Sequence, residues 1–480
     1  MVPKPTKEQF KQVYDQGFEA TFALFEVFQQ AVENLTQRVA HLESILAKDS
    51  HNSSKPPSSD GFKRPPKSLR EKSKRSSGGQ RGHEGSTLRQ IENPNDIKDL
   101  RPEGKCKCGK HLSNAEIVDI EKRQVIGITI DRHVVEYRRY VVACPCGEIH
   151  SGEFPLGVNA PVQYGDDLKG LAIYFMVTQL IPQERTRQIF EDILKIPLSE
   201  GTLTRILQQG HDGLEKTDAA IQERIVESAV VHADETGCDV NKDGWWIHAL
   251  GTLEYTWYFC DEHRGKDAAP VADLLSRYKG CLVHDGWKSY LHYVCKHALC
   301  NAHHLRELVF VDEQLKEPWA RKMKKQLLKI KEAVEDAKNR GSHSLAKKLQ
   351  KRFRRAYLAI IREGLAAQPP PKKRRKGQRG RLAQPPAKNL LDRLCHHIDE
   401  VLAFMYDFTI PFTNNLAERD LRMVKVKLKI SGCFRCSNGA RIFCRIRSFV
   451  STLRKQQLNI LQYLSRIFDP VYKNTNLLPG

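Results

Sequence analysis

Residues 226–310 carry the pattern that most restricts what this chain can fold into. Short apolar runs alternate there with turns, in the order ESAVVHADETG, GWWIHALG, EYTWYFC, a helical KDAAPVADLLSRY and GCLVHDG. Runs of this length between turn residues are typical of strands, and the longer amphipathic stretch is typical of a helix. The pattern therefore predicts three strands, a helix and another strand, which is an α/β core.

Two aspartates follow apolar runs of this core. Asp234 comes after Ala229–Val231 in HADETG, and Asp285 comes after Cys281–Val283 in HDGW, so both are expected at or near strand ends. One such aspartate alone is often only a turn former. Two of them on adjacent strands of one sheet can converge, and metal-dependent phosphoryl transfer needs carboxylates that converge on one or two Mg²⁺ ions.

A third carboxylate lies in a basic helical segment, TNNLAERDLRMVKVKLK. Glu418 falls on one predicted helix face with Arg422, Lys425 and Lys429, and Thr413, Asn414 or Asn415 can cap the helix. A solvated helix with ion pairs one turn apart would look similar. From Arg419 to Arg447, however, nine basic residues stand against Asp420 alone, which suits a metal ligand beside a phosphodiester backbone. We expect this basic run, Arg435 included, to hold phosphates.

Four cysteines form two similar tight turns, CKCGK and CPCGE, on either side of a segment with strand-like alternation over 115–145. Four thiolates can close a tetrahedral Zn²⁺ site that replaces the core of a small module. The predicted ligands are Cys106, Cys108, Cys144 and Cys146. Because the C-x-C spacing is tighter than the usual C-x-x-C, His111 or His150 remains an alternative ligand; unligated cysteines in turns are the other alternative.

The N-terminal residues 1–48 carry an apolar seam with the alternating three- and four-residue spacing of a coiled coil. Its members are Phe25, Phe28, Val32, Leu35, Val39, Leu42 and Leu46. The seam predicts self-association, although a helix packed on its own domain would show a similar stripe. A basic Ser/Pro/Gly-rich linker follows over 50–87, and a second basic Pro-rich break lies at 368–381.

The chain has 480 residues, with 78 basic and 57 acidic side chains and a net charge of +21. An excess of this size favours a polyanionic partner such as nucleic acid. The sequence contains no apolar run long enough to span a membrane and no signal-like start, and its 13 cysteines are odd in number. We therefore expect a cytoplasmic protein in a reducing compartment that does not associate with membranes.

Two further segments have more than one interpretation. Residues 182–207 read as helix, turn, helix, with Ser199 or Thr202 opening the second helix; this is either a DNA-reading helix-turn-helix or a plain helical hairpin. Cys300, His303 and His304 in CNAHHLREL have metal-like spacing, but a structural or DNA-positioning role is the broader expectation, with His303 near the active site as the sharper one. The tryptophans of the core are expected to pack.

Several strings in the chain resemble the transposases of the bacterial insertion sequence 66 family over nearly its full length. They are NSSKPPSSDG, GGQRGHEGSTL, APVQYG, HADETG, HDGW, AKNLLDRL and PFTNNLAERDLRMVKVKLKISGCFR, together with the cysteine pairs. The resemblance implies a leucine zipper, a zinc-binding domain and an RNase H-like DDE core with a helical insertion. By motif, the triad would be Asp234, Asp285 and Glu418, and Lys425 would lie near the scissile phosphate.

The resemblance and the patterns together give the expected organisation. The segments are a coiled coil (1–48), a linker (49–100), a zinc-binding domain (101–155), a helical, possibly DNA-reading region (160–222), the first part of the core (223–310), a helical insertion (311–400) and the last part of the core (401–470). The expected function is a DNA transposase that uses Mg²⁺ or Mn²⁺ to cut the terminal inverted repeats and join the 3′-hydroxyl to double-stranded target DNA. Sibling proteins of the same element are implied as accessory partners. The alternatives are an inactive zinc-containing DNA-binding protein and an RNase H-like nuclease without strand transfer.

Overall fold

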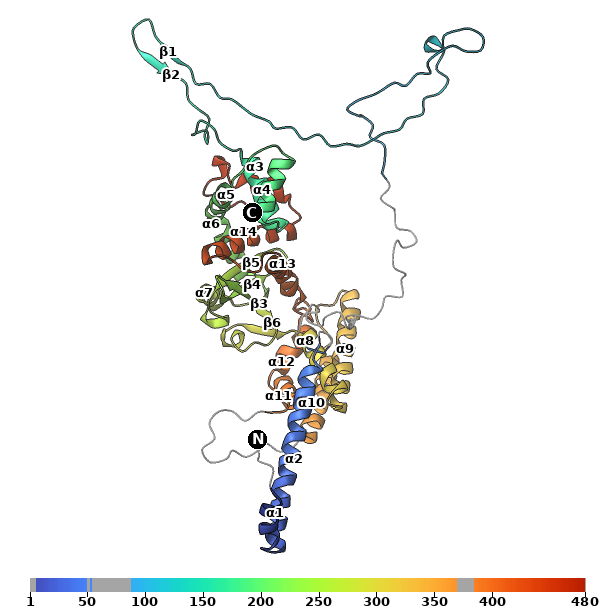
Figure 1. Ribbon diagram of the computed structural model, residues 1–480, viewed down its shortest axis with the longest axis vertical. Helices are drawn as coiled ribbons and strands as arrows, with labels where there is room; N and C mark the ends of the chain where they lie inside the picture. Colours follow the sequence, from blue (N-terminus) through green and yellow to red (C-terminus); the bar gives the residue numbers. More distant parts are fainter. Residues whose placement is uncertain (1–5, 50–51, 54–87, 369–383, 480) are drawn as a thin grey trace. The chain divides into compact units, whose positions relative to one another are not determined.

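The computed structural model describes residues 6–49, 52–53, 88–368 and 384–479 (Figure 1). Most of the linker expected at 50–87, and nearly all of the basic break at 368–381, lie outside these described residues. Two compact units divide the described chain: residues 6–49, 52–53, 137–188, 198–368 and 384–479 form the first, and residues 88–136 and 189–197 form the second. Of the helices in the described ranges, none has the length and apolar content that a membrane span requires.

A five-stranded mixed sheet lies at the centre of the first unit. Its strands are β3 (Val230–Val240), β4 (Asp243–Gly251), β5 (Thr256–Asp261), β6 (Cys281–His284) and β7 (Lys296–Leu299), in the spatial order β5-β4-β3-β6-β7. β4 is antiparallel to β3 and β5, whereas β6 runs parallel to both β3 and β7. The helix α7 (Ala269–Arg277) makes the crossover from β5 to β6. The three strands, helix and strand predicted from the sequence are confirmed, and β7 was not predicted.

A helical region precedes the sheet, as expected for residues 160–222. It consists of α3 (Asp166–Ile173), a π-helical turn (Tyr174–Thr178), α4 (Gln183–Asp192), α5 (Glu200–Gly213) and α6 (Glu215–Glu227). Ser199 caps α5 by accepting a hydrogen bond from the Thr202 amide at 3.0 Å, so the predicted opening of the second helix is confirmed. Whether this pair reads DNA stays a prediction.

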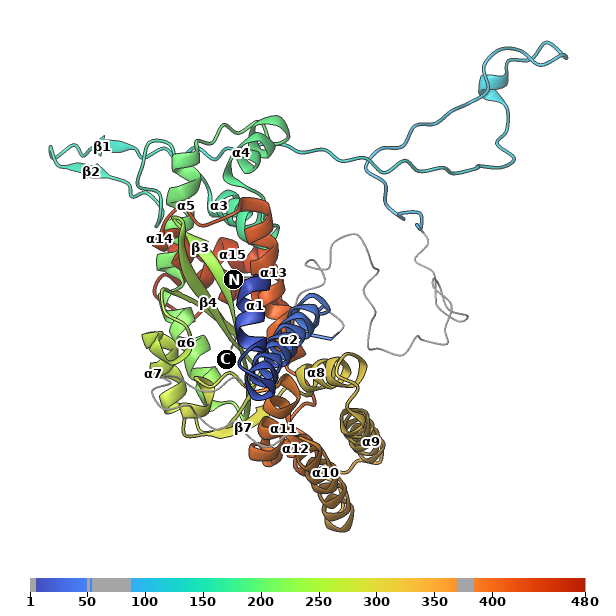
Figure 2. The same ribbon diagram turned by 60° about the horizontal axis from the view of Figure 1, so that its bottom comes forward.

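Five helices lie between β7 and the last part of the fold. They are α8 (Asn301–Glu313), α9 (Pro318–Asn339), α10 (Lys347–Ala367), α11 (Pro386–His396) and α12 (Ile398–Tyr406), and they share an apolar core around Trp319, Met323 and Tyr357. The helical layer thus begins ten residues before the predicted boundary at 311, since α8 starts directly after β7. α12 packs on β7 (Figure 2).

The C-terminal helices cover the other strands. α13 (Asn415–Ser431) packs on β3 and β4, and α14 (Ser437–Lys455) packs on β5 (Figure 1). Gly432, with a φ of +74°, ends α13. α15 (Ile460–Arg466) packs on α3.

The strand prediction for 115–145 is mostly wrong. Only β1 (Val141–Ala143) forms there, paired with β2 (Ile149–Ser151), and residues 116–140 have no strand. A strand needs a neighbour for its amides and carbonyls. In the described chain nothing supplies one, and Val118 and Val125 are 96% and 98% exposed.

The N-terminal segment is helical, as the seam predicts, in α1 (Lys7–Tyr14) and α2 (Phe18–Leu46). All seven seam residues are between 49% and 84% exposed in the single chain. Phe18 and Phe22, also exposed, extend the same spacing towards the N-terminus.

Candidate active site

The three predicted carboxylates come from three elements of the first unit. Asp234 lies inside β3 rather than at its end, because β3 continues to Val240 to pair with β4. Asp285 directly follows β6, as predicted, and Glu418 lies in the first turn of α13. The position of each therefore depends on how β3, β6 and α13 meet.

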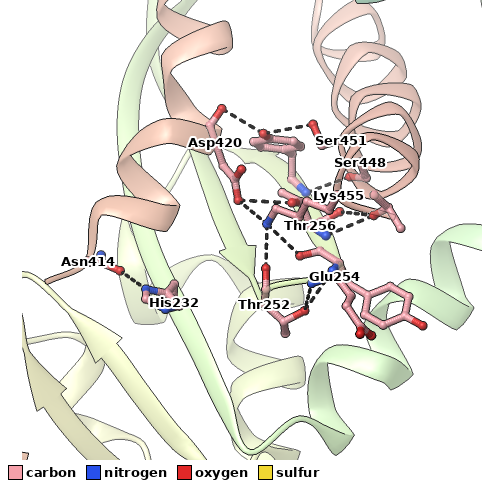
Figure 3. Close-up of polar contacts among 12 residues, drawn as sticks. His232, Thr252, Glu254, Thr256, Asn414, Asp420, Ser448, Ser451 and Lys455 are labelled. Atoms are coloured by element: carbon pink, nitrogen blue, oxygen red, sulfur yellow. Dashed lines mark hydrogen bonds and ion pairs between the residues drawn. The ribbon is translucent and has the colours of Figure 1, made fainter. Parts of the chain in front are cut away.

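Asn414, just before α13, joins this helix to β3 (Figure 3). It was one of three predicted capping residues, but its side chain makes no capping hydrogen bond. Instead its Oδ1 accepts from His232 Nδ1 at 2.8 Å and its Nδ2 donates to the Ala233 carbonyl at 2.8 Å. Its backbone amide donates to Cys300 Sγ at 3.1 Å. These bonds hold the first turn of α13, and so Glu418, beside the strand that carries Asp234.

The carboxylates act on one another electrostatically. Burial, followed by the negative charges of Asp285, Glu235 and Glu418, raises the pKa of Asp234 from 3.8 to about 7. Neither Asp234 nor Asp285 forms an ion pair within the described ranges. The oxygens of the three predicted ligands do not all lie within 4.8 Å of one another there. In a site for two ions about 3.5–4 Å apart, the ligands divide between the ions, so the three carboxylates need not all lie this close to one another.

Glu235 is a functional candidate that the sequence reasoning missed. Its side chain is only 3% exposed and accepts a hydrogen bond from Arg264 Nε at 3.0 Å and another from the Tyr290 hydroxyl. The Arg264 guanidinium also lies over two rings, 4.4 Å from the centre of Trp246 and 3.7 Å from that of Trp287. The signal was available: a second acid beside Asp234 on a buried strand requires a partner.

We call Glu235, Arg264, Tyr290 and the two tryptophans the Glu235 clamp. Trp287 and Tyr290 belong to the loop that begins with Asp285, and the Trp287 amide donates to Asp285 Oδ1 at 2.8 Å. The clamp therefore fixes this loop against β3. The two tryptophans of the clamp pack on a half-buried cation, since the Arg264 side chain is 33% exposed, and Trp287 is itself 37% exposed.

Glu418 lies beside a histidine and an arginine of α8. His303 Nε2 is 3.9 Å and Arg306 Nη2 is 3.8 Å from Glu418 Oε1. Burial, assisted by the charges of Arg306 and Arg393, lowers the pKa of His303 to about 3, so the imidazole is neutral. The structure thus places His303 next to a predicted catalytic residue, in line with the sharper of its two interpretations.

The basic residues around Glu418 divide into two groups. Arg422, Lys425, Lys429 and Arg435 are all exposed and form no ion pair in the described part of the chain. By contrast, Arg447 is 2% exposed and donates to the Val177 carbonyl at 3.3 Å. Arg445 donates to the His211 carbonyl at 3.1 Å. The expectation that the whole basic run holds phosphates is therefore wrong for its last two members, which join α14 to the helical region.

Asp420, the lone acid of the basic segment, is structural. Lys455 Nζ lies 2.8 Å from its Oδ2, and Thr256 Oγ1 donates to the same oxygen at 3.2 Å (Figure 3). Lys455 also donates to the carbonyls of Thr252 and Tyr255. This network joins α13 and α14 to the edge of the sheet through Asp420 Oδ2, which gives Asp420 a structural role away from the three carboxylates.

The two cysteine turns have the same backbone geometry. The Cys106 amide donates to the Lys110 carbonyl at 2.9 Å, and the Cys144 amide donates to the Glu148 carbonyl at 2.7 Å. Gly109 and Gly147 take φ of +88° and +92°. Backbone hydrogen bonds hold the pKa of the Cys106 and Cys146 thiols below the ordinary value, which favours thiolate. The first turn belongs to the second unit and the second turn to the first unit.

Comparison with known families gives the identity of the chain. A model of the Transposase IS66 family matches residues 162–442. The chain belongs to this family. The matched range includes Asp234, Asp285, Glu418 and the exposed basic residues, so this family member is a transposase whose candidate site lies inside the family region. Residues 3–89 match a family of unknown function (DUF6444), and no curated protein matches the chain.

Proposed function

We propose that this IS66 family transposase is a DDE enzyme that cuts the ends of its element and joins the freed 3′-hydroxyls to target DNA by metal-dependent phosphoryl transfer. Water would attack the phosphodiester at the element end and leave a 3′-hydroxyl. That hydroxyl would then attack a target phosphodiester in line, without a covalent protein intermediate. The single observation that supports this best is the arrangement of Asp234, Asp285 and Glu418, which three separate elements bring close enough for Asp285 and Glu418 to raise the pKa of Asp234.

The donor set fits a hard divalent cation. Asp234 is largely buried, and its charge is opposed by three neighbouring carboxylates rather than balanced by a cation. Carboxylate oxygens are the ligands that Mg²⁺ and Mn²⁺ prefer. Asp234, Asp285 and Glu418 would hold the ion, which when bound would polarise the scissile phosphate and lower the pKa of the attacking water.

The remaining residues of the site have positioning and DNA-binding roles in this proposal. The Glu235 clamp would keep Asp285 in place, and Asn414 would keep Glu418 in place. Lys425, seven residues after Glu418 and exposed, would contact the phosphate backbone together with Arg422, Lys429 and Arg435.

The proposal extends to the rest of the chain. The strand order β5-β4-β3-β6-β7, with β3 and β6 parallel and neighbouring, is what an RNase H-like core requires, since it brings Asp234 and Asp285 to adjacent strands. The two cysteine turns would bind one structural Zn²⁺ and, with the basic linker, grip the terminal repeats. The exposed seam of α2 would pair two subunits so that both ends are cut together, with accessory proteins of the element as further partners.

The test is a reconstituted reaction on supercoiled plasmid that carries both element ends, with Mg²⁺ or Mn²⁺. Asp234→Asn, Asp285→Asn and Glu418→Gln should each abolish cleavage while DNA binding persists. The matched control is Asp239→Asn, an exposed aspartate on the same strand, which should cleave as the unchanged protein does. Carboxylate variants that cleave normally would refute the triad.

The same reaction separates the alternatives. Cleavage without joining to target DNA would favour a nuclease. Sequence-specific binding that yields no metal-dependent product, and that is unaltered by Asp234→Asn, would favour a DNA-binding protein.

A further inference from the structure

We propose that Cys300, His303 and Glu418 form a binding site for a thiophilic divalent metal of the Zn²⁺ class, and that metal bound there inhibits the transposase by withdrawing Glu418 from the other two carboxylates. The inhibitory part rests on the proposed function; the metal site itself does not.

The three side chains are gathered at the point where two helices begin. Cys300 is the last residue before α8, His303 is the third residue of α8, and Glu418 lies in the first turn of α13. One ligand atom from each lies within 4.8 Å of the other two, and within the described ranges no other three His, Cys, Asp or Glu residues meet this condition. The C-x-x-H spacing places the thiol and the imidazole on one side of the helix start.

The distances need little adjustment. Tetrahedral Zn²⁺ with bonds of about 2.0–2.2 Å to nitrogen and oxygen separates these ligand atoms by about 3.4 Å. His303 Nε2 and Glu418 Oε1 are 3.9 Å apart. A small side-chain rotation that moves either atom by a few tenths of an ångström brings the two atoms to the separation that Zn²⁺ needs. A water molecule would complete the four ligands.

The donor atoms are those that a thiophilic metal selects. Cys300 is 1% exposed, and its sulfur contacts the Asn414 amide and no cation within the described residues. The Nδ1 atom of His303 is buried and without a hydrogen-bond partner there. The other ring nitrogen, Nε2, lies 3.9 Å from Glu418 Oε1 and is the atom that binds the metal in this arrangement. The side chain of Glu418 is 35% exposed, so a metal ion can reach the site from solvent.

One neighbour opposes binding and gives a test of its own. Arg306 Nη2 lies 3.8 Å from the same Glu418 oxygen, so its charge repels an incoming dication and competes for the carboxylate. The site should therefore be of moderate affinity, and Arg306→Gln should strengthen it. Mg²⁺, which avoids thiolate ligands, would not compete for Cys300.

The experiment uses Cd²⁺ as the probe, because its bond to a thiolate absorbs in the ultraviolet. The full chain would carry serine at the six cysteines whose C-x-C or C-x-x-C spacing also suits a metal. These are Cys106, Cys108, Cys144, Cys146, Cys433 and Cys436. In this background we expect one Cd²⁺ per chain, no thiolate band after Cys300→Ser, and binding at least tenfold weaker after His303→Gln.

The matched control is Cys395→Ser, a half-buried cysteine of α11, which should leave the band unchanged. Arg306→Gln should raise the affinity for Cd²⁺ several-fold, because Arg306 competes for Glu418. If Cys300 alone bound the metal, this substitution would not change the affinity. A thiolate band that survives Cys300→Ser overturns the site.

Inhibition is measured separately in the unsubstituted chain. Micromolar Zn²⁺ should reduce Mn²⁺-supported cleavage. In the Cys300→Ser variant, at least tenfold more Zn²⁺ should be needed for the same fractional loss of cleavage. Cadmium bound through Cys300 with no such difference would overturn the inhibitory role. If no preparation cleaves DNA, the proposed function fails, while the cadmium titration still decides the site.

Discussion

The buried charge of Asp234 makes a quantitative prediction about stability. An aspartate has a pKa of 3.8 in the unfolded chain, and Asp234 has one of about 7 in the folded protein. The folded state therefore binds the proton more tightly, so without metal the free energy of unfolding falls as pH rises from about 4 to about 7 and is level above that. At about 1.4 kcal/mol per pH unit, the loss amounts to about 4 kcal/mol.

Asp234→Asn removes the charge and keeps the shape, and its Oδ1 can still accept the Glu235 amide bond that Asp234 accepts at 2.9 Å. The variant should match the unchanged protein in stability near pH 4. At pH 8 it should be more stable by up to about 4 kcal/mol. A stability gain on loss of this carboxylate would show that the site holds uncompensated negative charge.

The assay is urea unfolding in EDTA at several pH values from 5 to 8, followed by tryptophan fluorescence. Trp246, Trp257 and Trp287 report on this core because they lie on or beside its strands. Asp239→Asn on the same strand is the control and should give the same difference from the unchanged protein at every pH. When saturating Mn²⁺ replaces EDTA, the difference in unfolding free energy between Asp234→Asn and the unchanged protein at pH 8 should become smaller, since Mn²⁺ binds only the unchanged site. A stability difference for Asp234→Asn that is equal at pH 5 and pH 8 would refute the reasoning.

Three other predictions address separate parts of the chain. Leu35→Glu, in the middle of the exposed seam, should convert the oligomer to monomer in light scattering; an unchanged oligomer would mean that the seam packs elsewhere. Lys425→Ala should weaken DNA binding equally for specific and random sequences and lower the slope of log affinity against log salt by about 1, whereas an unchanged slope would exclude a phosphate contact. Metal analysis should find about one zinc per chain, lost on Cys106→Ser with Cys144→Ser; clearly less zinc in the unchanged protein would remove the zinc-binding domain from the proposal.

How much could be predicted from the sequence depended on whether a feature was local. The strands that carry Asp234 and precede Asp285 were predictable from their apolar runs, although β3 does not end in a turn after Asp234 but continues to Val240. β7 was missed because it has only four residues, of which Lys296 is exposed and His297 half-buried. The Glu235 clamp could not be predicted, since its members come from β3, β4 and two loops whose contact depends on the folded sheet.

The basic segment also shows that local sequence does not tell which side chains become buried. Charge counting treated every arginine and lysine from Arg419 to Arg447 alike. On α14, however, the apolar period turns Arg447 inward among buried residues, where it bonds a carbonyl of the π-helical turn. Which basic residues of a long helix lie inside depends on how its faces pack, and charge counting does not record that.

The helical insertion raises the question of how Glu418 reaches a site built by strands more than 100 residues earlier. The answer lies in its two ends, which meet directly. The Asn301 amide, at the start of the insertion, donates to the Phe412 carbonyl at 3.1 Å, and the Asn414 amide donates to Cys300 Sγ. Because the chain leaves the core and returns to it at one point, the length of the insertion has no effect on the distance from β3 to α13. The geometry of the carboxylates then depends on a few buried hydrogen bonds around Asn414, each worth about 1 kcal/mol net and more when one partner is left unpaired. The same junction supplies Cys300 and His303, so the place where the insertion is joined to the core is also where the proposed thiophilic metal would reach Glu418.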